Sequence, residues 1–223
     1  MIHDLPWIEH RDQVWGGKTY AQHGDDIIML CIFHQLKIYG ASWLDIGAHH
    51  PFHLSNTALF YQRGGRGINV EPNPDLMKEF RKHRPEDINL CAGVGAKSGS
   101  RPFFCTNAPG LSSFDYGLAS SYGIVSEIDV PVITVEEIIN QHRNGIFPDM
   151  LTIDAEGLDM EILGSINWSG STPKVVCAEA FTADRDVSSE LKILMIDKGY
   201  FLHSWAVNNM IFARLDLHDR LCG

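Results

Sequence analysis

An acidic residue that comes a short way after a turn of small residues is the clearest chemical feature of this sequence. The apolar segment 42–46 leads into Gly47 and Ala48, and the segment 67–70 leads into Glu71. A glycine turn lets a ligand approach the backbone closely, and a carboxylate roughly 20 residues further on accepts hydrogen bonds from ribose hydroxyls. Glu71 would repel a 2′-phosphate. The sequence therefore predicts a site for an adenosine-type cofactor and disfavours an NADP-type dinucleotide.

Acidic residues also follow two later apolar segments. Asp154 follows segment 150–153, and Glu179 follows segment 174–178. The carboxyl ends of parallel strands meet at one edge of a sheet, so we expect both side chains near the first turn. A Mg²⁺ ion held by these two carboxylates is a less favoured hypothesis, because no third oxygen ligand is evident.

Three histidines lie just after Gly47, at positions 49, 50 and 53. A helical zinc motif needs two histidines four residues apart on one helix, and Pro51 interrupts any helix here. We therefore do not expect a zinc site. His49 is instead a candidate base or a contact of the cofactor.

The composition favours one acidic α/β domain over residues 1–223. The chain has 44% apolar residues and a formal charge of −10, and its length is enough for one sizeable core. Nucleic acid is disfavoured as a partner, because such binding depends on cationic contacts with phosphate. The two basic patches, 63–66 and 78–84, are expected to form a turn and a solvated helix face.

The cysteines and the N-terminus favour a cytoplasmic location. Five cysteines are an odd number, and they lack the spacing of metal ligands, which favours free thiols. Segment 1–12 has acidic residues and lacks the apolar core of a secretory signal. No apolar stretch approaches the roughly 18 residues that span a bilayer. The oligomeric state cannot be predicted from these features.

Apolar periodicity, caps and helix breakers predict alternating strands and helices. Asn73 and Pro74 supply the N-cap and the first position of one helix. Segment 96–126 is the least regular, and we expect a short strand there and a long loop through Ser112 and Ser113. The expected strands are 42–46, 67–70, 87–92, 101–105, 130–134 (at a sheet edge), 150–153, 174–178, 200–205 and 209–213; the expected helices are 25–39, 55–62, 75–83, 135–142, 156–163 and 188–198.

This alternation implies a mostly parallel sheet with helices on both faces. The chain closes with two strands joined by a short turn and no helix between them. A seven-stranded sheet with a C-terminal antiparallel hairpin is characteristic of the class I methyltransferases, which form a Rossmann-like three-layer α/β sandwich. We expect residues 25–214 to form this core and residues 1–24 an N-terminal segment that closes over the cofactor as a flap.

Segments in a fixed order along residues 20–214 resemble the FkbM family of methyltransferases. The resemblance implies methyl transfer from S-adenosylmethionine, commonly to hydroxyl groups of sugars or secondary metabolites. His49 stands where the family often has Asn, and Pro51 stands where a third glycine is common. The segments are 20–26 (YAQHGDD), 44–51 (LDIGAHHP), 55–61 (SNTALFY), 68–76 (INVEPNPDL), 151–163 (LTIDAEGLDMEIL) and 173–181 (PKVVCAEAF).

The resemblance and the strand-end positions give these residues their expected roles. An alcohol is a poor nucleophile, so the enzyme must align the two reacting centres and take up a proton. Asp154 is expected to hold the methionine amino group, orient the acceptor hydroxyl or act as the base, and Glu156 either shares in the chemistry or stabilises the start of its helix. The expected cofactor contacts are Asp45, Gly47, Ala48, His49, Glu71, Pro72, Gly93, Val94 and Asp154, and the expected catalytic residues are Asp154, Glu156 and His49.

Other functions remain as alternatives. The incomplete GxGxxG motif and the closing hairpin disfavour an oxidoreductase, and the acidic charge disfavours a nucleic-acid or protein methyltransferase. A catalytically silent module that binds S-adenosylmethionine and a Mg²⁺-assisted sugar O-methyltransferase stay open. The acceptor, a small molecule or a glycan, is expected against residues 1–24, 106–126 or 181–188, whose aromatic side chains can stack on a sugar.

Overall fold

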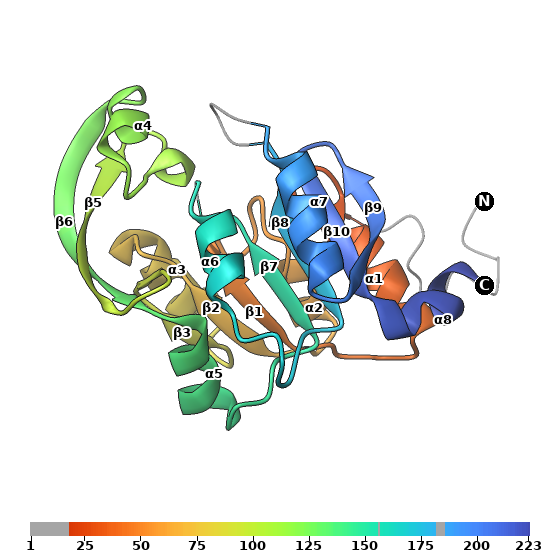
Figure 1. Cartoon of the computed structure of the whole chain (residues 1–223). Helices are drawn as coiled ribbons and strands as arrows, with labels where there is room; N and C mark the ends of the chain where they lie inside the picture. The colour runs from red at the N-terminus through yellow and green to blue at the C-terminus, as the bar shows by residue number, and fades with distance from the viewer. Residues whose placement is uncertain (1–17, 156, 182–185) are drawn as a thin grey trace.

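The main sheet has seven strands in the order β3-β2-β1-β7-β8-β10-β9 (Figure 1). The computed structural model describes residues 18–155, 157–181 and 186–223, so Glu156 and most of the predicted flap lie outside it. β10 is antiparallel to β8 and β9, and the other neighbouring strands are parallel, as predicted. The strands are β1 (Trp43–Ile46), β2 (Gly67–Val70), β3 (Ile88–Leu90), β7 (Met150–Ile153), β8 (Val175–Glu179), β9 (Tyr200–Ala206) and β10 (Asn209–Arg214).

Helices cover both faces of this sheet and complete three layers (Figure 1). Successive residues of a strand face opposite layers. Leu44 and Ile46 pack with residues of α5, α6 and α7, whereas Trp43 packs with residues of α1 and α2. Both faces are therefore apolar, as expected for buried parallel strands. The helices of the main body are α1 (Asp25–Gln35), α2 (Ala58–Gln62), α3 (Pro74–His83), α5 (Val135–Arg143), α6 (Asp159–Ser165), α7 (Ser188–Asp197), η2 (Leu215–Leu217) and α8 (His218–Cys222).

A second, three-stranded sheet forms where the sequence analysis expected mostly loop. Its central strand, β6 (Ile124–Ile133), pairs along β5 (Gly99–Thr106) and, at its end, with β4 (Gly93–Val94). The predicted strands 101–105 and 130–134 are confirmed as parts of β5 and β6, but the expected edge position of 130–134 is wrong, because β6 lies between β4 and β5. Many residues of β5 and β6 are exposed, so the apolar alternation that would have revealed this hairpin is weak.

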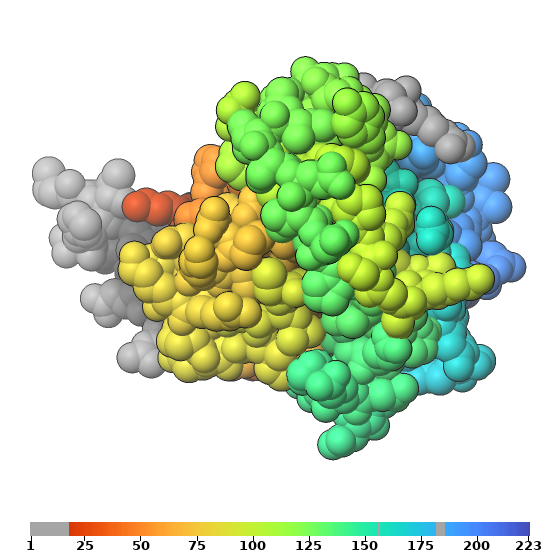
Figure 2. All heavy atoms as spheres, turned by 90° about the vertical axis from the view of Figure 1, so that its left-hand side faces the viewer, coloured from red at the N-terminus to blue at the C-terminus, as the bar shows by residue number. Residues whose placement is uncertain are grey.

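We call residues 99–133 the arm. Between its two strands lie the short helices η1 (Pro109–Leu111) and α4 (Tyr116–Ser120). The arm curves beside the main sheet in Figure 1, and Figure 2 shows it as a band over one face of the molecule. Because β4 belongs to this second sheet, the arm is fixed to the end of β3, next to the edge where strand-end ligands bind.

Local signals set the helix boundaries. Asn73 accepts a hydrogen bond from the Asp75 amide at the start of α3, and Pro74 occupies the first position, as predicted. A capping box begins α5: the Thr134 hydroxyl accepts from the Glu137 amide, and the Glu137 carboxylate accepts from the Thr134 amide. None of the described helices is both long and apolar enough to cross a membrane.

We expect the replacement Thr134→Ala to lower the free energy of unfolding by about 1 kcal/mol, because it removes the cap of α5. Urea unfolding followed by circular dichroism measures the change. Ser126→Ala, at an exposed position of β6, is the control and should change stability by less than about 0.5 kcal/mol. Equal effects of the two replacements would contradict the role of the capping box.

Candidate active site

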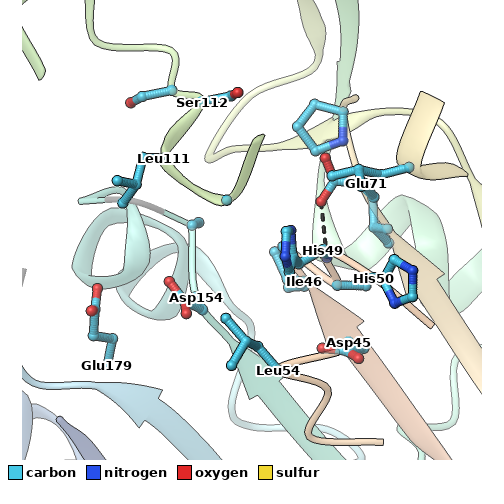
Figure 3. Close-up of a pocket in the computed structure, with 18 of the residues that line it drawn as sticks. Asp45, Ile46, His49, His50, Leu54, Glu71, Leu111, Ser112, Asp154 and Glu179 are labelled. Carbon is cyan, nitrogen blue, oxygen red and sulfur yellow. Dashed lines mark hydrogen bonds between the residues drawn. The ribbon is translucent and has the colours of Figure 1, made fainter. Parts of the chain in front are cut away.

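One cavity of about 870 Å³ lies at the carboxyl ends of β1, β2, β7 and β8 (Figure 3). Residues 108–114 of the arm and the β9–β10 turn complete its wall. Of the residues predicted from the sequence, the structure brings the following into this wall: Asp45, Gly47, Ala48, His49, Glu71, Pro72, Gly93, Val94, Asp154 and Glu179. The cavity is of the size that ordinarily holds a small molecule, roughly 300–1,000 Å³.

The close approach of the end of β7 requires glycine at position 47. Its φ is 74°, and a Cβ atom at this position would lie 1.8 Å from the backbone oxygen of Asp154. The amide of Asp154 also donates to the carbonyl of Ile46 at 3.0 Å. Only glycine therefore lets the ends of β1 and β7 meet, a reason that the sequence analysis did not include.

Glu71 is a buried carboxylate held by two backbone amides. One oxygen accepts from the His49 amide at 3.0 Å, drawn as the dashed line in Figure 3, and the other accepts from the Asn73 amide at 2.8 Å. The pKa of Glu71 is raised to about 8 as the result of three effects. Burial raises it most, these two hydrogen bonds lower it, and the charges of Asp45 and Asp154 raise it. Each oxygen keeps a lone pair for a hydroxyl donor in the cavity.

His49 has a neutral imidazole in the cavity wall. Its φ is 54°, unusual for a residue other than glycine, and its ring packs against Gly110 of the arm. Burial, with His50 and His53 nearby, lowers its pKa to about 4. Its Nδ1 atom is buried and has no hydrogen-bond partner among the described residues. The strained backbone and the unused nitrogen make His49 a candidate contact for a ligand.

His50 stabilises the turn itself. Its Nδ1 atom accepts hydrogen bonds from the amides of Phe52 and His53 at 3.1 and 3.0 Å. Among the described residues there is no group of three or more His, Cys, Asp or Glu that could hold a metal ion. The Mg²⁺ hypothesis thus still rests on Asp154 and Glu179 alone.

Asp45 and Asp154 lie at the ends of adjacent strands. Asp45 is buried, and one of its oxygens accepts from the Thr57 hydroxyl at 2.8 Å. The pKa of Asp45 is raised to about 6. Burial is the largest cause and raises it, Thr57 and Arg84 lower it, and Asp154 raises it further. In Figure 3, Asp154 and Glu179 lie on one side of the cavity and Glu71 and His49 on the other.

Glu179 ends β8, the strand next to β7, as predicted. Ile153 pairs with Ala178, so the two carboxylates come directly after a paired position. Asn209 of β10 is paired with Glu179 and also lines the cavity, together with Asn208. The two asparagines were not predicted as site residues, because they stand only at the closing turn and at the start of the last expected strand.

Gly93 and Val94 form β4 and line the cavity beside the ring of Phe114. A Cβ atom on Gly93 would lie 2.4 Å from this ring, so glycine allows the aromatic side chain to lie directly on the strand. Phe114, one of the aromatic residues of segment 106–126 expected against the acceptor, therefore lies beside two expected cofactor contacts. Ser112 and Ser113 line the cavity and also hold the arm, because their hydroxyls accept from the amides of Thr106 and Asp115.

The burial of several charged residues was not predicted from the sequence, and Arg84 and Asp159 are two of them. Arg84 was assigned to a solvated helix face, but its side chain is fully buried between α3 and the sheet. Asp159, at the start of α6, accepts from the Ala155 amide at 3.3 Å. Burial raises the pKa of Asp159 to about 7, with a further increase from Asp154. The spacing of charges along a helix did not reveal either burial.

The family model of the methyltransferase FkbM domain matches residues 45–202, which is more than two thirds of the chain. The chain belongs to the FkbM methyltransferase family. It is thus a methyltransferase with a class I fold, and this membership implies the use of S-adenosylmethionine. The matched residues begin at Asp45 and include the ends of β1, β2, β7 and β8 described above.

Three similar solved structures share little sequence with this chain. An FkbM methyltransferase from Methylobacillus flagellatus KT has 12% identity and a TM-score of 0.47; the match covers 87% of this chain but only 56% of that protein. A precorrin-6y C5,15-methyltransferase from Geobacter metallireducens GS-15 has 14% identity and a TM-score of 0.43, with 88% and 91% covered. A TehB-like methyltransferase from Corynebacterium glutamicum has 13% identity and a TM-score of 0.45, with 89% and 90% covered. None of the curated proteins matches significantly.

The buried carboxyl groups of this FkbM domain give its stability a pH dependence. The folded pKa of Asp159, about 7, exceeds the ordinary value of 3.8, so the folded state binds this proton more tightly than the unfolded state. Its stabilising effect is complete below pH 4 and is lost as the pH rises to 7. Between pH 5 and pH 8, the wild type should lose roughly 2–3 kcal/mol of unfolding free energy that Asp159→Asn keeps.

Urea unfolding of both proteins at pH 5 and pH 8 tests this expectation. Asp219→Asn, at an exposed position of α8, is the control and should leave the difference between the two pH values unchanged. If the difference between Asp159→Asn and the wild type is the same at both pH values, the assignment of Asp159 is wrong.

Proposed function

We propose that this protein transfers the methyl group of S-adenosylmethionine to a hydroxyl group of a sugar, glycan or secondary metabolite. The observation that carries the proposal is Glu71, a buried carboxylate that two backbone amides hold at the end of β2 in the wall of the cavity. A carboxylate so fixed matches the two neighbouring hydroxyl donors of a ribose.

The chemistry of the cavity fits S-adenosylmethionine. Glu71 would accept from the ribose hydroxyls, and the slot beside Gly93, Val94 and the Phe114 ring would hold a flat base. The carboxylates of Asp45 and Asp154 would face the ammonium group of the methionine part. Gly47, Ala48, His49 and Pro72 would contribute backbone and side-chain contacts.

The remaining task of the protein is to align an acceptor hydroxyl and to remove its proton. S-adenosylmethionine supplies a methyl group that is already activated by the sulfonium charge. Asp154 is the proposed base or orienting group, with His49 as the second candidate because its buried Nδ1 atom has no hydrogen-bond partner among the described residues. The arm and η1 would keep water from the reacting centre. Glu156 keeps its proposed role in catalysis.

The proposed acceptor is a neutral hydroxyl compound that meets the amide side chains of the cavity. Gln22, Asn56, Asn208 and Asn209 all line it, beside the ring of Phe181. Amide groups and aromatic faces suit hydroxyl-rich molecules.

The five cysteines are free, which supports a reducing compartment such as the cytoplasm.

Titration calorimetry followed by an acceptor screen tests the function. We expect S-adenosylmethionine and S-adenosylhomocysteine to bind and NAD not to bind. Transfer of a labelled methyl group to sugars, glycans or small alcohols would then support the enzyme. Binding without transfer to any acceptor would favour the silent module, and activity lost with EDTA and restored by Mg²⁺ would favour the metal-assisted alternative. Failure to bind either cofactor form would overturn the proposal.

Glu71→Gln is expected to weaken the binding of S-adenosylhomocysteine by about 10- to 100-fold. A glutamine cannot accept from both amides and both ribose hydroxyls at once, and hydrogen bonds to a charged group contribute about 1.5–3 kcal/mol. Calorimetry at pH 8.5, where the carboxylate is ionised, measures the change. Glu127→Gln, at an exposed position of β6, should bind like the wild type; an unchanged affinity of Glu71→Gln would contradict the proposed ribose contact.

Asp154→Asn is expected to lower kcat by about 10²–10⁴-fold if Asp154 takes up the proton. The dissociation constant of S-adenosylhomocysteine should change much less, because Asp45 and Glu71 remain. The comparison of kcat with donor affinity therefore separates a base from a donor contact. A large loss of donor affinity with an unchanged kcat would assign Asp154 to the methionine part instead.

A further inference from the structure

Arg84 directly follows α3 and carries a fully buried guanidinium group. Its Nε and Nη2 atoms both lie 2.9 Å from one oxygen of Asp87. Its Cζ atom lies 5.2 Å from the ring centroids of Trp43 and Phe80 and 5.1 Å from that of Tyr61. An ion pair with Asp87 and three aromatic faces compensate the cost of burying the charge.

Two further contacts of Arg84 reach residues that directly follow residues of the cavity wall, His50 and Asn56. Its Nη1 atom donates to the hydroxyl of Thr57 at 3.0 Å and to the carbonyl of Pro51 at 3.4 Å. Thr57 donates its single hydroxyl proton to Asp45, so its oxygen must accept from Arg84. The chain of hydrogen bonds therefore has one direction, from Arg84 through Thr57 to Asp45.

We propose that Arg84 is a positioning residue of the methyl-donor site: through Thr57 it orients the carboxylate of Asp45, and through the Pro51 carbonyl it fixes the turn that contains His49. The inference rests on the proposed function, in which Asp45 faces the ammonium group of the donor. Arg84 itself does not line the cavity and is not a catalytic residue.

The charges around Asp45 explain why such a residue is needed. Asp154 after β7, Glu71 after β2 and Asp87 are acidic groups that act on Asp45, and Arg84 is the cation that acts on it. Burial favours the protonated, neutral form of Asp45, which would lose the attraction to an ammonium group. The Thr57 hydrogen bond and the Arg84 charge favour the ionised form.

Stability alone would not demand this arrangement. A buried ion pair can often be replaced by well-packed apolar residues without loss of stability. The side-chain oxygen of Asn69, on β2, accepts from Arg84 at 3.1 Å and also from the ring nitrogen of Trp43, on β1. The guanidinium thus connects β1 and β2 with the turn that contains His49. The planar group with five donors serves these partners at once, which a lysine cannot do.

The pair Thr57→Val and Thr57→Ser tests the inference with Arg84 in place. Valine has nearly the same shape but no hydroxyl, and serine restores the hydroxyl. We expect the binding of S-adenosylhomocysteine to wild type and Thr57→Ser to weaken as the pH falls, in one step near pH 8 from Glu71 and a second near pH 6 from Asp45. For Thr57→Val the midpoint of the Asp45 step should move up by about one pH unit, and the dissociation constant at pH 7 should rise about three- to tenfold.

Calorimetry between pH 5 and pH 8.5 gives these profiles. Glu71, His49 and Cys177 are present in both variants, so the difference between the two profiles isolates Asp45. Arg84→Lys should show the same upward shift with a larger loss of affinity. Arg81→Gln, which removes an exposed arginine from the last turn of α3, should bind like the wild type. Thermal melting confirms that each variant is folded.

The outcomes separate the two proposals. If folded Thr57→Val binds like Thr57→Ser at every pH, Arg84 does not act through Thr57 and the inference is wrong. If the wild type does not bind S-adenosylhomocysteine at any pH, the proposed function fails instead. A loss of affinity in Thr57→Val without a shift of the pH midpoint would also overturn the role of Asp45 ionisation.

Discussion

The contact between the ends of β1 and β7 is the constraint on which the cavity depends. The carbonyl oxygen of Asp154 occupies the space that a side chain at position 47 would need, and the Asp154 amide bonds to Ile46. This contact brings Asp45 and Asp154 to the same place and directs the next residues of β1 into a turn with positive φ at Gly47 and His49. The turn then places the His49 amide on Glu71, so the three strand ends form one site.

Such a site concentrates negative charge where water is scarce. Asp45, Glu71 and Asp159 all have raised pKa values because they are buried near one another or near Asp154. The protein compensates in two ways: backbone amides bind Glu71 and Asp159, and the Arg84–Thr57 pair acts on Asp45. A cationic ligand would relieve the remaining repulsion, which is consistent with a sulfonium donor. The fold thus accepts repulsion among these carboxyl groups that the binding of a cation can offset.

The main sheet was predictable because parallel strands buried on both faces appear as short apolar runs between helix signals. The arm was not, because residues such as Val125 and Glu127 are exposed and leave little periodicity. Glu71 and Asp154 were found from their positions at strand ends. Arg84 was missed because its burial depends on Asp87 and Trp43, which are neighbours only in the folded chain.

Under the proposed function, the cavity has a donor half, whose residues lie in local sequence motifs, and an acceptor half, whose residues meet only in the folded chain. The donor half comes from strand ends and turns whose residues lie in short motifs, and glycine, proline and acidic positions there have few alternatives. The amide side chains of the other half come from segments far apart in the sequence: Gln22 before α1, Asn56 before α2, and Asn208 and Asn209 in the hairpin. No local pattern links them, and each is a common loop residue. A specificity surface assembled in this way can change by single replacements without disturbing the β1–β7 contact, so one fold can serve many acceptors.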